Sequence, residues 1–501
     1  MRGFVMTILS LVLVFSSSAQ VTGLFINDNV DLRTWEEHLA RPDISFHSAL
    51  RSYGHAGGFD TSKVKLAEVF RHRVIPLLDL TGSAQVSDST VSGQRAIMGL
   101  GLEERFGKRW SLDLAVLGGF SKQAEFYEPY TEKAEILEGY GQASQNNDLY
   151  TFWDINGRLQ FQADEHFSFE VGKAKHFLGD GYRSLFLSDH ASPYPYLRID
   201  TKVWHLHYMN LFSWQQGMLY PGGGPSAFED KFTSTHLLSW NISETFNIQL
   251  FETIIWQGQD SLSNRNFDVH YLNPIIFYRP VEFSSGSADN AIIGLGLSFL
   301  AWPKYQLYGQ IAFDEFLLSE FRNRTGWWGN KFGVQAGVKG HPFATAPKLF
   351  MQAEVNIVRP FTYSHGSPVQ SYTHLNQSLA HPQGSNFTEY MVIATQRWKD
   401  YEIRGRLAYV MKGFDELGRN LGGDIFRSYE GPFMNFDNVI GQGLRAELWS
   451  AELFGSWILD QERDTRIQLG YSLLHQGGEL DGQMIHGLQL SVRSSLGDGY
   501  R

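Results

Sequence analysis

The feature that most constrains the fold is a set of stretches, about ten residues long, in which apolar and polar residues alternate. In residues 349–358 the even positions include Gln352, Glu354 and Asn356, and all five odd positions are apolar: Leu349, Met351, Ala353, Val355 and Ile357. The same alternation recurs in residues 110–120, 305–313, 401–410 and 465–473. Because a period of two places alternate side chains on opposite faces of a β-strand, each stretch is expected to be a strand with one apolar and one wet face.

Three further features favour a membrane protein over a soluble β-sandwich, which would alternate too. The stretches have the length that crosses a bilayer when tilted, about ten residues, whereas soluble strands average about five or six. Their polar faces carry full charges, which suit a wet lumen and are costly in an apolar core. Aromatic residues stand at strand ends, where an interfacial girdle would lie: Trp110, Trp302, Tyr305, Trp398 and Tyr401. The sequence predicts an all-β fold, a transmembrane antiparallel β-barrel of about 16–18 strands.

The composition agrees with a barrel and excludes other classes. Aromatic residues make up 14% of the chain although its mean hydropathy is −0.25, as expected when lumen-facing polar residues offset lipid-facing apolar ones. After residue 19 the most apolar run is 291–302, which is too short for a membrane helix of about twenty residues. The chain has no cysteine, which excludes disulfides, thiolate metal ligands and a lipoprotein anchor.

The N-terminus has the pattern of an export signal. Arg2 precedes the apolar stretch 4–15, and small residues follow up to a predicted cleavage after Ala19. Removal of the signal removes Arg2 and leaves 41 of the 42 basic residues and all 53 acidic ones. The resulting net charge of −12 argues against a nucleic-acid partner. Residues 20–70 lack the alternation, and 32–39 has an amphipathic helical pattern. The predicted organisation is a signal peptide at 1–19, a small, partly helical periplasmic or plug segment at 20–70, and the barrel at 71–501, with a first strand near Val74.

Turn signals alternate with long connections. Tight turns are predicted at 107–108, 164–166, 302–304 and 399–400. Longer connections, expected to be extracellular loops or lumen plugs, are predicted at about 121–149, 257–270, 359–386 and 413–440. In a bacterial barrel the short turns are periplasmic and the long loops extracellular. Residues 484–496 are predicted to be the closing strand.

Catalytic signatures are incomplete. The chain has no metalloprotease, nucleophile-elbow or P-loop motif, and Gly179-Asp180-Gly181 lacks the third glycine of a phosphate-binding loop. Asp314 and Glu315 are neighbours in a strand and should face opposite sides, so one of them is expected to pair with a lumen arginine. We expect a non-enzymatic protein without a cofactor or metal, with an outer-membrane Ser–His hydrolase as the alternative.

Four blocks carry a family resemblance: residues 177–197, 273–290, 308–316 and 330–337. GDGYRSLFLSDHASPYP, with its glycines and prolines, resembles a stretch of the capsule-assembly (Wzi-like) outer-membrane barrels. NPIIFYRPVEFSSGSADN and YGQIAFDEF look closer to the Bacteroidota branch of that family, which includes gliding-motility-associated outer-membrane proteins. The resemblance covers roughly residues 150–340 by motif. The sequence departs from the capsule group at Asp180, where proline is common, and in a longer 121–149 connection.

The resemblance implies an eighteen-stranded barrel with a small helical periplasmic part. It also implies a role in holding surface polysaccharide to the outer membrane, or a related surface function. The residues that match by position are Gly179, Gly181, Arg183, Ser184, Ser188, Asp189, Asn273, Arg279, Asp289, Asn290, Asp314 and Glu315.

These residues have a structural and a functional interpretation. In the structural one, Gly179 and Gly181 allow positive φ in a turn or plug loop, and the charged residues form a lumen network that holds this loop. In the functional one, exposed aromatic and polar loop residues stack on sugars; the candidates are Tyr127, Tyr130, Tyr140, Tyr363 and His365.

The predicted function is therefore surface polysaccharide attachment or assembly, or surface-associated gliding motility, at the bacterial outer membrane. The alternatives are a structural subunit of a secretion or motility complex and a porin-like channel. The expected partners are outer-membrane lipid, surface polysaccharide and other secretion or motility proteins.

Overall fold

The computed structural model describes residues 35–36, 44–50, 70–86, 90–122, 135–147, 149–258, 269–272, 289–301, 305–461, 463–479 and 482–496. The predicted signal peptide and most of the 20–70 segment lie outside these residues. Within the described part of the chain, no helix is long and apolar enough to cross a membrane.

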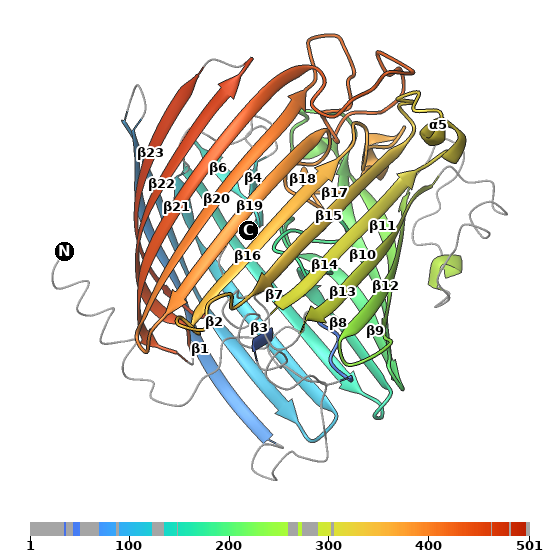
Figure 1. Ribbon diagram of the computed structural model, residues 1–501. Helices are drawn as coiled ribbons and strands as arrows, with labels where there is room; N and C mark the ends of the chain where they lie inside the picture. The colour runs from blue at the N-terminus through green and yellow to red at the C-terminus, as the bar shows by residue number, and fades with distance from the viewer. Residues whose placement is uncertain are drawn as a thin grey trace.

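Eighteen long strands form one closed antiparallel sheet, which confirms the predicted barrel (Figure 1). Each strand pairs with the next one along the chain, and β1 also pairs with β23, where Leu78 lies opposite Ser494. Closure leaves no strand edge whose N–H and C=O groups would face lipid unpaired. The strands are β1 (Phe70–Val86), β2 (Thr90–Phe106), β3 (Trp110–Lys122), β7 (Leu149–Gln162), β8 (Phe167–Ala174), β9 (Tyr194–Val203), β10 (Leu206–Met218), β11 (Phe228–Asn241), β12 (Phe246–Gln257), β13 (Asn290–Ala301), β14 (Tyr305–Glu315), β15 (Lys331–Gly340), β16 (Leu349–Val358), β19 (Phe387–Arg397), β20 (Tyr401–Phe414), β21 (Leu444–Asp460), β22 (Thr465–Gly478) and β23 (Gln483–Ser494).

The alternation in the sequence separates an outer from an inner face. On β20, Tyr401, Ile403 and Leu407 are exposed on the outside, whereas Glu402 is 4% exposed inside. Large apolar side chains are exposed around the whole wall, among them Leu100, Trp153, Leu295, Leu407, Leu469 and Leu488. An apolar outer surface on a closed sheet is what a bilayer requires, since lipid offers no hydrogen-bonding partner.

The long loops lie at one end of the barrel, at the top of Figure 1, and the connections at the other end are short. The tight turns predicted at 107–108, 164–166 and 399–400 are at the short-turn end, and the one at 302–304 lies outside the described residues. The long-loop end is called the outer end here, after the expectation that short turns are periplasmic in bacterial barrels.

Minor elements decorate the loops. They are β4 (Ile136–Leu137), β5 (Gly141–Gln142), β6 (Ser144–Asn146), η2 (Pro225–Ala227), η3 (Val269–Leu272), α5 (Leu318–Arg322), η4 (Pro368–Gln370), β17 (Thr373–His374) and β18 (Gln377–Ser378). The sequence did not predict α5. Its Leu318 and Phe321 are exposed, and the ring centroids of Phe321 and Phe316 lie 5.4 Å apart. Exposed apolar side chains where a strand leaves the barrel suit the membrane–water boundary.

The boundaries differ slightly from the predicted ones. The first strand begins at Phe70, four residues before Val74, and the closing strand ends at Ser494. Of the helix predicted at 32–39, only Trp35 and Glu36 are described, and both are helical. The indole of Trp35 donates to Gln306 Oε1 of β14 at 2.5 Å, so this N-terminal segment contacts the inner wall.

Candidate functional site

The largest hydrophobic core lies inside the barrel and is built around the connection between β8 and β9, here named the first plug loop (residues 175–193). Leu185 and Phe186 are 0% exposed, and Phe186 stacks on Phe251 of β12 with ring centroids 4.6 Å apart. Leu178 pairs with Leu187 and with Leu50 of the N-terminal segment. Most of the block at 177–197 is therefore part of a loop that fills the lumen, and β9 begins at its end, at Tyr194.

Two glycines of this loop are required for different reasons. Gly179 has φ of +134°, as predicted, and an added Cβ would lie 2.3 Å from Gln310 Nε2. The predicted positive φ is wrong for Gly181. Here a Cβ would lie 2.6 Å from both Arg183 O and Glu354 Oε2, so the constraint is the close approach of the loop to the wall.

The connection between β16 and β19, here named the second plug loop (residues 359–386), packs against the first. Ser188 N donates to Leu379 O at 2.7 Å, and Ser188 Oγ donates to Ala380 O. Tyr363 Oη donates to Leu185 O at 2.8 Å. Ser184 Oγ stays within the first loop and donates to Leu178 O at 2.5 Å. Hydrogen bonds thus join the two plug loops into one unit inside the barrel.

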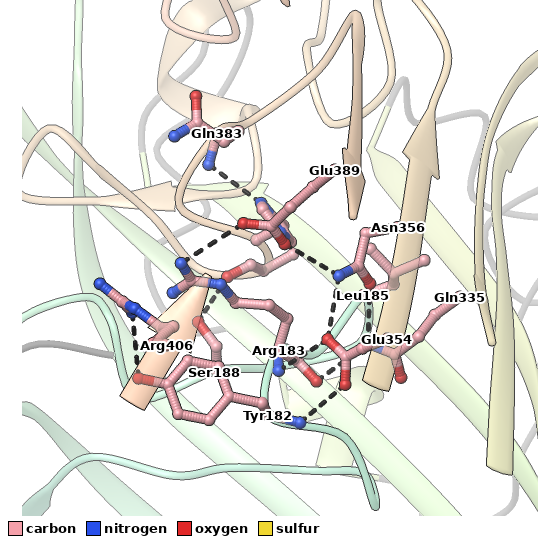
Figure 2. Close-up of polar contacts among 12 residues, drawn as sticks. Tyr182, Arg183, Leu185, Ser188, Gln335, Glu354, Asn356, Gln383, Glu389 and Arg406 are labelled. Atoms are coloured by element: carbon pink, nitrogen blue, oxygen red, sulfur yellow. Dashed lines mark hydrogen bonds and ion pairs between the residues drawn. The ribbon is translucent and has the colours of Figure 1, made fainter. Parts of the chain in front are cut away.

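Side chains of the wall hold the first plug loop by its backbone (Figure 2). The carboxylate of Glu354 on β16 accepts the N–H groups of Tyr182 at 2.8 Å and Arg183 at 3.1 Å. Gln310 Oε1 on β14 accepts the N–H of Leu185 at 2.8 Å. These carboxylate and amide oxygens replace the water molecules that would accept from the loop's N–H groups if the loop were exposed.

One carboxylate on β19 is bound by both loops. Glu389 is 1% exposed and accepts from His381 Nε2 of the second plug loop at 2.8 Å. Asn356 Nδ2 donates to the same oxygen at 3.0 Å, and the other oxygen lies 3.5 Å from Arg183 Nη2 of the first plug loop. Figure 2 shows Glu389 between the arginine and the asparagine. The sequence analysis did not single out Glu389, Glu354 or His381.

Asp314 and Glu315 hold a lysine. Lys331 Nζ of β15 lies 3.2 Å from Asp314 Oδ1 and 3.1 Å from Glu315 Oε1, so the predicted arginine partner is wrong. Both carboxylates reach one lysine because the register shifts between Phe313 and Glu315, which removes the strict alternation of faces. Asp314 Oδ2 also accepts the N–H of Tyr363, which anchors the second plug loop.

The 273–290 block is described only at its end, and Asn273 and Arg279 lie outside the described residues. Asp289 accepts from Tyr271 Oη at 2.6 Å, and Asn290 Nδ2 donates to Gln370 O of the second plug loop at 2.9 Å. At Asp189 of the first plug loop, the backbone oxygen accepts from Lys175 Nζ at 3.1 Å.

The proposed sugar-stacking aromatics are placed differently from the prediction. Tyr127 and Tyr130 lie outside the described residues, and Tyr140 is half-buried against Phe152, 4.9 Å away. The expected exposure of Tyr363 and His365 is wrong, since they are 0% and 8% exposed. Both belong to the second plug loop, which turns into the lumen instead of extending from the barrel.

Burial in the plug affects its histidines. It lowers the pKa of His365 to about 4 and of His374 to about 3. In each ring Nδ1 accepts a backbone N–H, from Ser367 at 3.2 Å and from Gln216 at 3.0 Å. Protonation would remove these acceptors, so both rings are neutral at pH 7.

The inner wall has a buried side and a side that solvent reaches. Inward side chains on β11–β16 are almost fully buried against the plug loops, for example Lys231, Glu252, Gln310, Lys331 and Asn356. Some inward side chains near the middle of β20–β22 are half-buried, namely Arg404, Arg406, Glu452, Phe454 and Ser472, whereas Glu402, Ser456 and Arg466 of the same strands are buried. The plug therefore fills the lumen unevenly.

The outer end carries exposed aromatics on the connection between β20 and β21, here named the rim loop (residues 415–443). Phe433 and Phe436 are 51% and 50% exposed, and the Arg419 guanidinium lies 4.7 Å from the Phe433 ring centroid. Trp328 N, in the connection between β14 and β15, donates to Asn435 O at 3.0 Å and braces this loop. The sequence analysis missed these aromatics, because a loop position alone does not reveal exposure.

Comparison with known protein families and with curated proteins finds no significant match. Among solved structures, the fold is similar to that of Wzi, an outer membrane protein involved in group 1 capsule assembly in Escherichia coli and a carbohydrate-binding β-barrel. The identity is 14%, the TM-score 0.50, and the match covers 82% of this chain and 83% of that one. OprD and OccK8 (OprE) of Pseudomonas aeruginosa also match, each at 8% identity, with TM-scores of 0.45 and 0.46. The OprD match covers 86% of this chain and 95% of that one, and the OccK8 match 84% and 97%.

Proposed function

We propose that this protein is a non-enzymatic bacterial outer-membrane barrel that holds polysaccharide at the cell surface. The observation that carries the proposal is the pair of plug loops, which bind each other and share Glu389 of the wall. A lumen filled by anchored loops leaves little room for bulk passage of solutes, so it suits a ligand-binding protein better than an open channel. The likeness in fold to a carbohydrate-binding barrel supports the same reading.

The rim loop offers a binding surface for sugar. Phe433 and Phe436 expose flat apolar faces, and Arg419 supplies hydrogen-bond donors next to one of them. Sugar rings combine apolar C–H faces with hydroxyl groups, so aromatic faces beside polar groups suit them. Tyr127 and Tyr130 are further candidates in the 121–149 connection, whereas the buried Tyr363 and His365 are not.

The test compares cell-bound with released polysaccharide in a deletion strain and its parent. A shift of polysaccharide into the medium with total synthesis unchanged is the expected result. Complementation with a Phe433→Ala, Phe436→Ala double variant should fail to restore retention. Phe343→Ala is the matched control, because Phe343 is 51% exposed at the opposite end of the barrel. An unchanged ratio in the deletion strain would overturn the proposal.

A restricted channel is the second candidate, favoured by the half-buried inner side chains of β20–β22. Planar-bilayer recordings separate the two functions: steady conductance of the wild-type protein supports a channel, and its absence supports a closed binding barrel. Surface-associated motility follows from the family resemblance, and a structural subunit of a secretion or motility complex is a separate alternative. Spreading assays of the deletion strain and partner capture after mild detergent extraction test them. Export by cleavage after Ala19 is checked by N-terminal sequencing of the mature protein.

A further inference from the structure

Four phenylalanine rings gather on the outside of the wall where β14 ends and β15 begins. Phe313 of β14 and Phe332 of β15 lie opposite each other on the outer face, with ring centroids 6.3 Å apart. Phe316 lies 5.1 Å from Phe313, and Phe321 of α5 lies 6.0 Å from Phe332. The connection after β14 therefore packs its aromatic side chains on the outer face of the barrel and not on the lumen.

The apolar side chains around these rings are exposed. Leu317, Leu318 and Phe321 are 45%, 48% and 51% exposed. Here the four phenylalanines and the two leucines are named the α5 patch. The α5 patch lies at the outer end of the barrel, beside the ends of β14 and β15 (Figure 1). Barrels place aromatic girdles at the boundary between the hydrocarbon and the headgroups, so the α5 patch is expected to contact acyl chains there.

Two arginines follow directly after these apolar side chains. Arg322 is the last residue of α5, Arg324 comes two residues later, and both are exposed. In the part of the chain that the structure describes, neither guanidinium forms an ion pair. The nearby Glu320 carboxylate accepts from Thr325 Oγ1 at 2.8 Å, and Asp437 of the rim loop donates its N–H to Thr325 O at 2.8 Å. Both positive charges are therefore available to an anion outside the chain.

The backbone of Arg324 supports a role for its side chain. Arg324 has φ of +53°, at the position after the C-cap where a helix usually has glycine. Its N–H donates to Phe321 O at 3.1 Å, and the N–H of Thr325 donates to Glu320 O at 3.3 Å, which is the hydrogen-bond pair of this helix end. Glycine would adopt this conformation without strain, whereas arginine is disfavoured there. A strained residue on an exposed surface points to a function of its side chain.

We propose that the α5 patch, with Arg322 and Arg324, is a binding site for the lipid A part of lipopolysaccharide. Lipid A carries acyl chains and phosphate groups on one sugar headgroup, and it occupies the outer leaflet of the outer membrane. Its acyl chains pack on the α5 patch, and a phosphate accepts hydrogen bonds from the two arginines, since guanidinium groups match phosphate oxygens. Basic side chains beside an apolar interfacial segment are typical of sites for anionic lipids. The proposal goes beyond polysaccharide attachment and shares with it only the position of the long loops at the cell surface.

The test is native mass spectrometry of the purified, delipidated full-length barrel, titrated with lipid A, dephosphorylated lipid A or phosphatidylglycerol. We expect the wild type to bind lipid A about tenfold or more tightly than either other lipid. The double variant Arg322→Gln, Arg324→Gly should weaken lipid A binding by about tenfold or more. Glycine suits the positive φ at position 324, so this variant keeps the helix end while it loses both charges.

Arg445→Gln is the matched control, because Arg445 is a half-exposed arginine at the outer end of β21 that pairs with Glu447. This variant should bind lipid A like the wild type, and thermal melting checks that each variant is folded. Wild-type affinity in the double variant, an equal loss in Arg445→Gln, or equally tight binding of dephosphorylated lipid A would overturn the site. Phosphatidylglycerol that binds as tightly as lipid A would overturn the choice of lipid. The titration does not involve polysaccharide, so failure of this site leaves the proposed function standing, and the reverse.

Discussion

His381 Nε2 lies 2.8 Å from a carboxylate oxygen of Glu389, and this contact ties the second plug loop to strand β19. The N–H of Gln383 donates to His381 Nδ1 at 3.1 Å, which leaves the proton of the neutral ring on Nε2, facing the carboxylate. Because Glu389 also pairs with Arg183 of the first plug loop, a single side chain connects both loops to the wall.

Replacing Glu389 with alanine should loosen the plug. Arg183 and His381 would lose a buried partner, and the loss of a buried charge partner costs about 3–5 kcal/mol. We expect a lower midpoint of thermal unfolding and new conductance in planar bilayers. Glu447→Ala is the control, since Glu447 is half-exposed and pairs with Arg445 at the outer end. A Glu389→Ala barrel that melts like the wild type and stays closed would contradict the role of this carboxylate.

Acidification should loosen the second plug loop. The pKa values of His365 and His374 lie near 4 and 3 in the folded protein, below the value of about 6.5 for an unfolded chain. The unfolded state therefore binds more protons below pH 6.5, and the stability present above this pH is lost as the pH falls towards 4. Each histidine contributes up to about 2 kcal/mol of this loss at pH 5.

The measurement is the thermal midpoint between pH 7.5 and 5. His374→Gln should show a shallower fall, because glutamine supplies an acceptor that does not titrate. His166→Gln serves as the control, since His166 lies in an exposed turn. An equal fall of the thermal midpoint in His374→Gln and in the wild type would show that protonation of His374 does not destabilise the plug.

Adding a methyl group at Gly181 should be costly. Its Cβ would lie 2.6 Å from Glu354 Oε2 and from Arg183 O, and backbone cannot move away as a flexible side chain can. We expect Gly181→Ala to destabilise the folded barrel by about 1–3 kcal/mol. Gly455→Ala, with no atom within 4 Å of the new Cβ, should leave the free energy of unfolding unchanged. The check is chemical unfolding of both variants in the same detergent, and equal stabilities would exclude the close approach.

Tyr363 and Phe433 should give opposite phenotypes. Tyr363→Phe removes the hydrogen bond to Leu185 O and should cost about 0.5–1.5 kcal/mol of stability without changing polysaccharide retention. Phe433→Ala should reduce retention and leave stability unchanged, because Phe433 is half-exposed. Thermal melting and the ratio of bound to released polysaccharide measure both effects. Retention lost in Tyr363→Phe at unchanged stability would move the sugar site into the plug.

The strands were predictable because their physical cause is local. Alternation along β20 separates Leu407 from Arg406, and no other part of the chain is needed to decide that one faces lipid and the other the lumen. The closing strand and most turns follow from the same pattern, which limited the number of strands only to about 16–18. The structural interpretation of Gly179 and Gly181, a turn or plug loop, also came from the sequence, since glycine allows backbone conformations that other residues rarely adopt.

The plug and its anchors were decided by tertiary structure. Glu389 and Arg183 are 206 residues apart, and only barrel closure brings them together. Tertiary structure also decided the position of Tyr363. Its loop is as long and polar as an extracellular one, but it turns into the lumen, where the Tyr363 hydroxyl donates to Leu185 O. At Asp314 and Glu315 a local register shift overrode the alternation. The sequence by itself determined which face of each strand meets lipid, because a period of two is a property of the backbone. Only the tertiary structure decided which loops enter the lumen and which charges pair there, because these depend on contacts between distant segments.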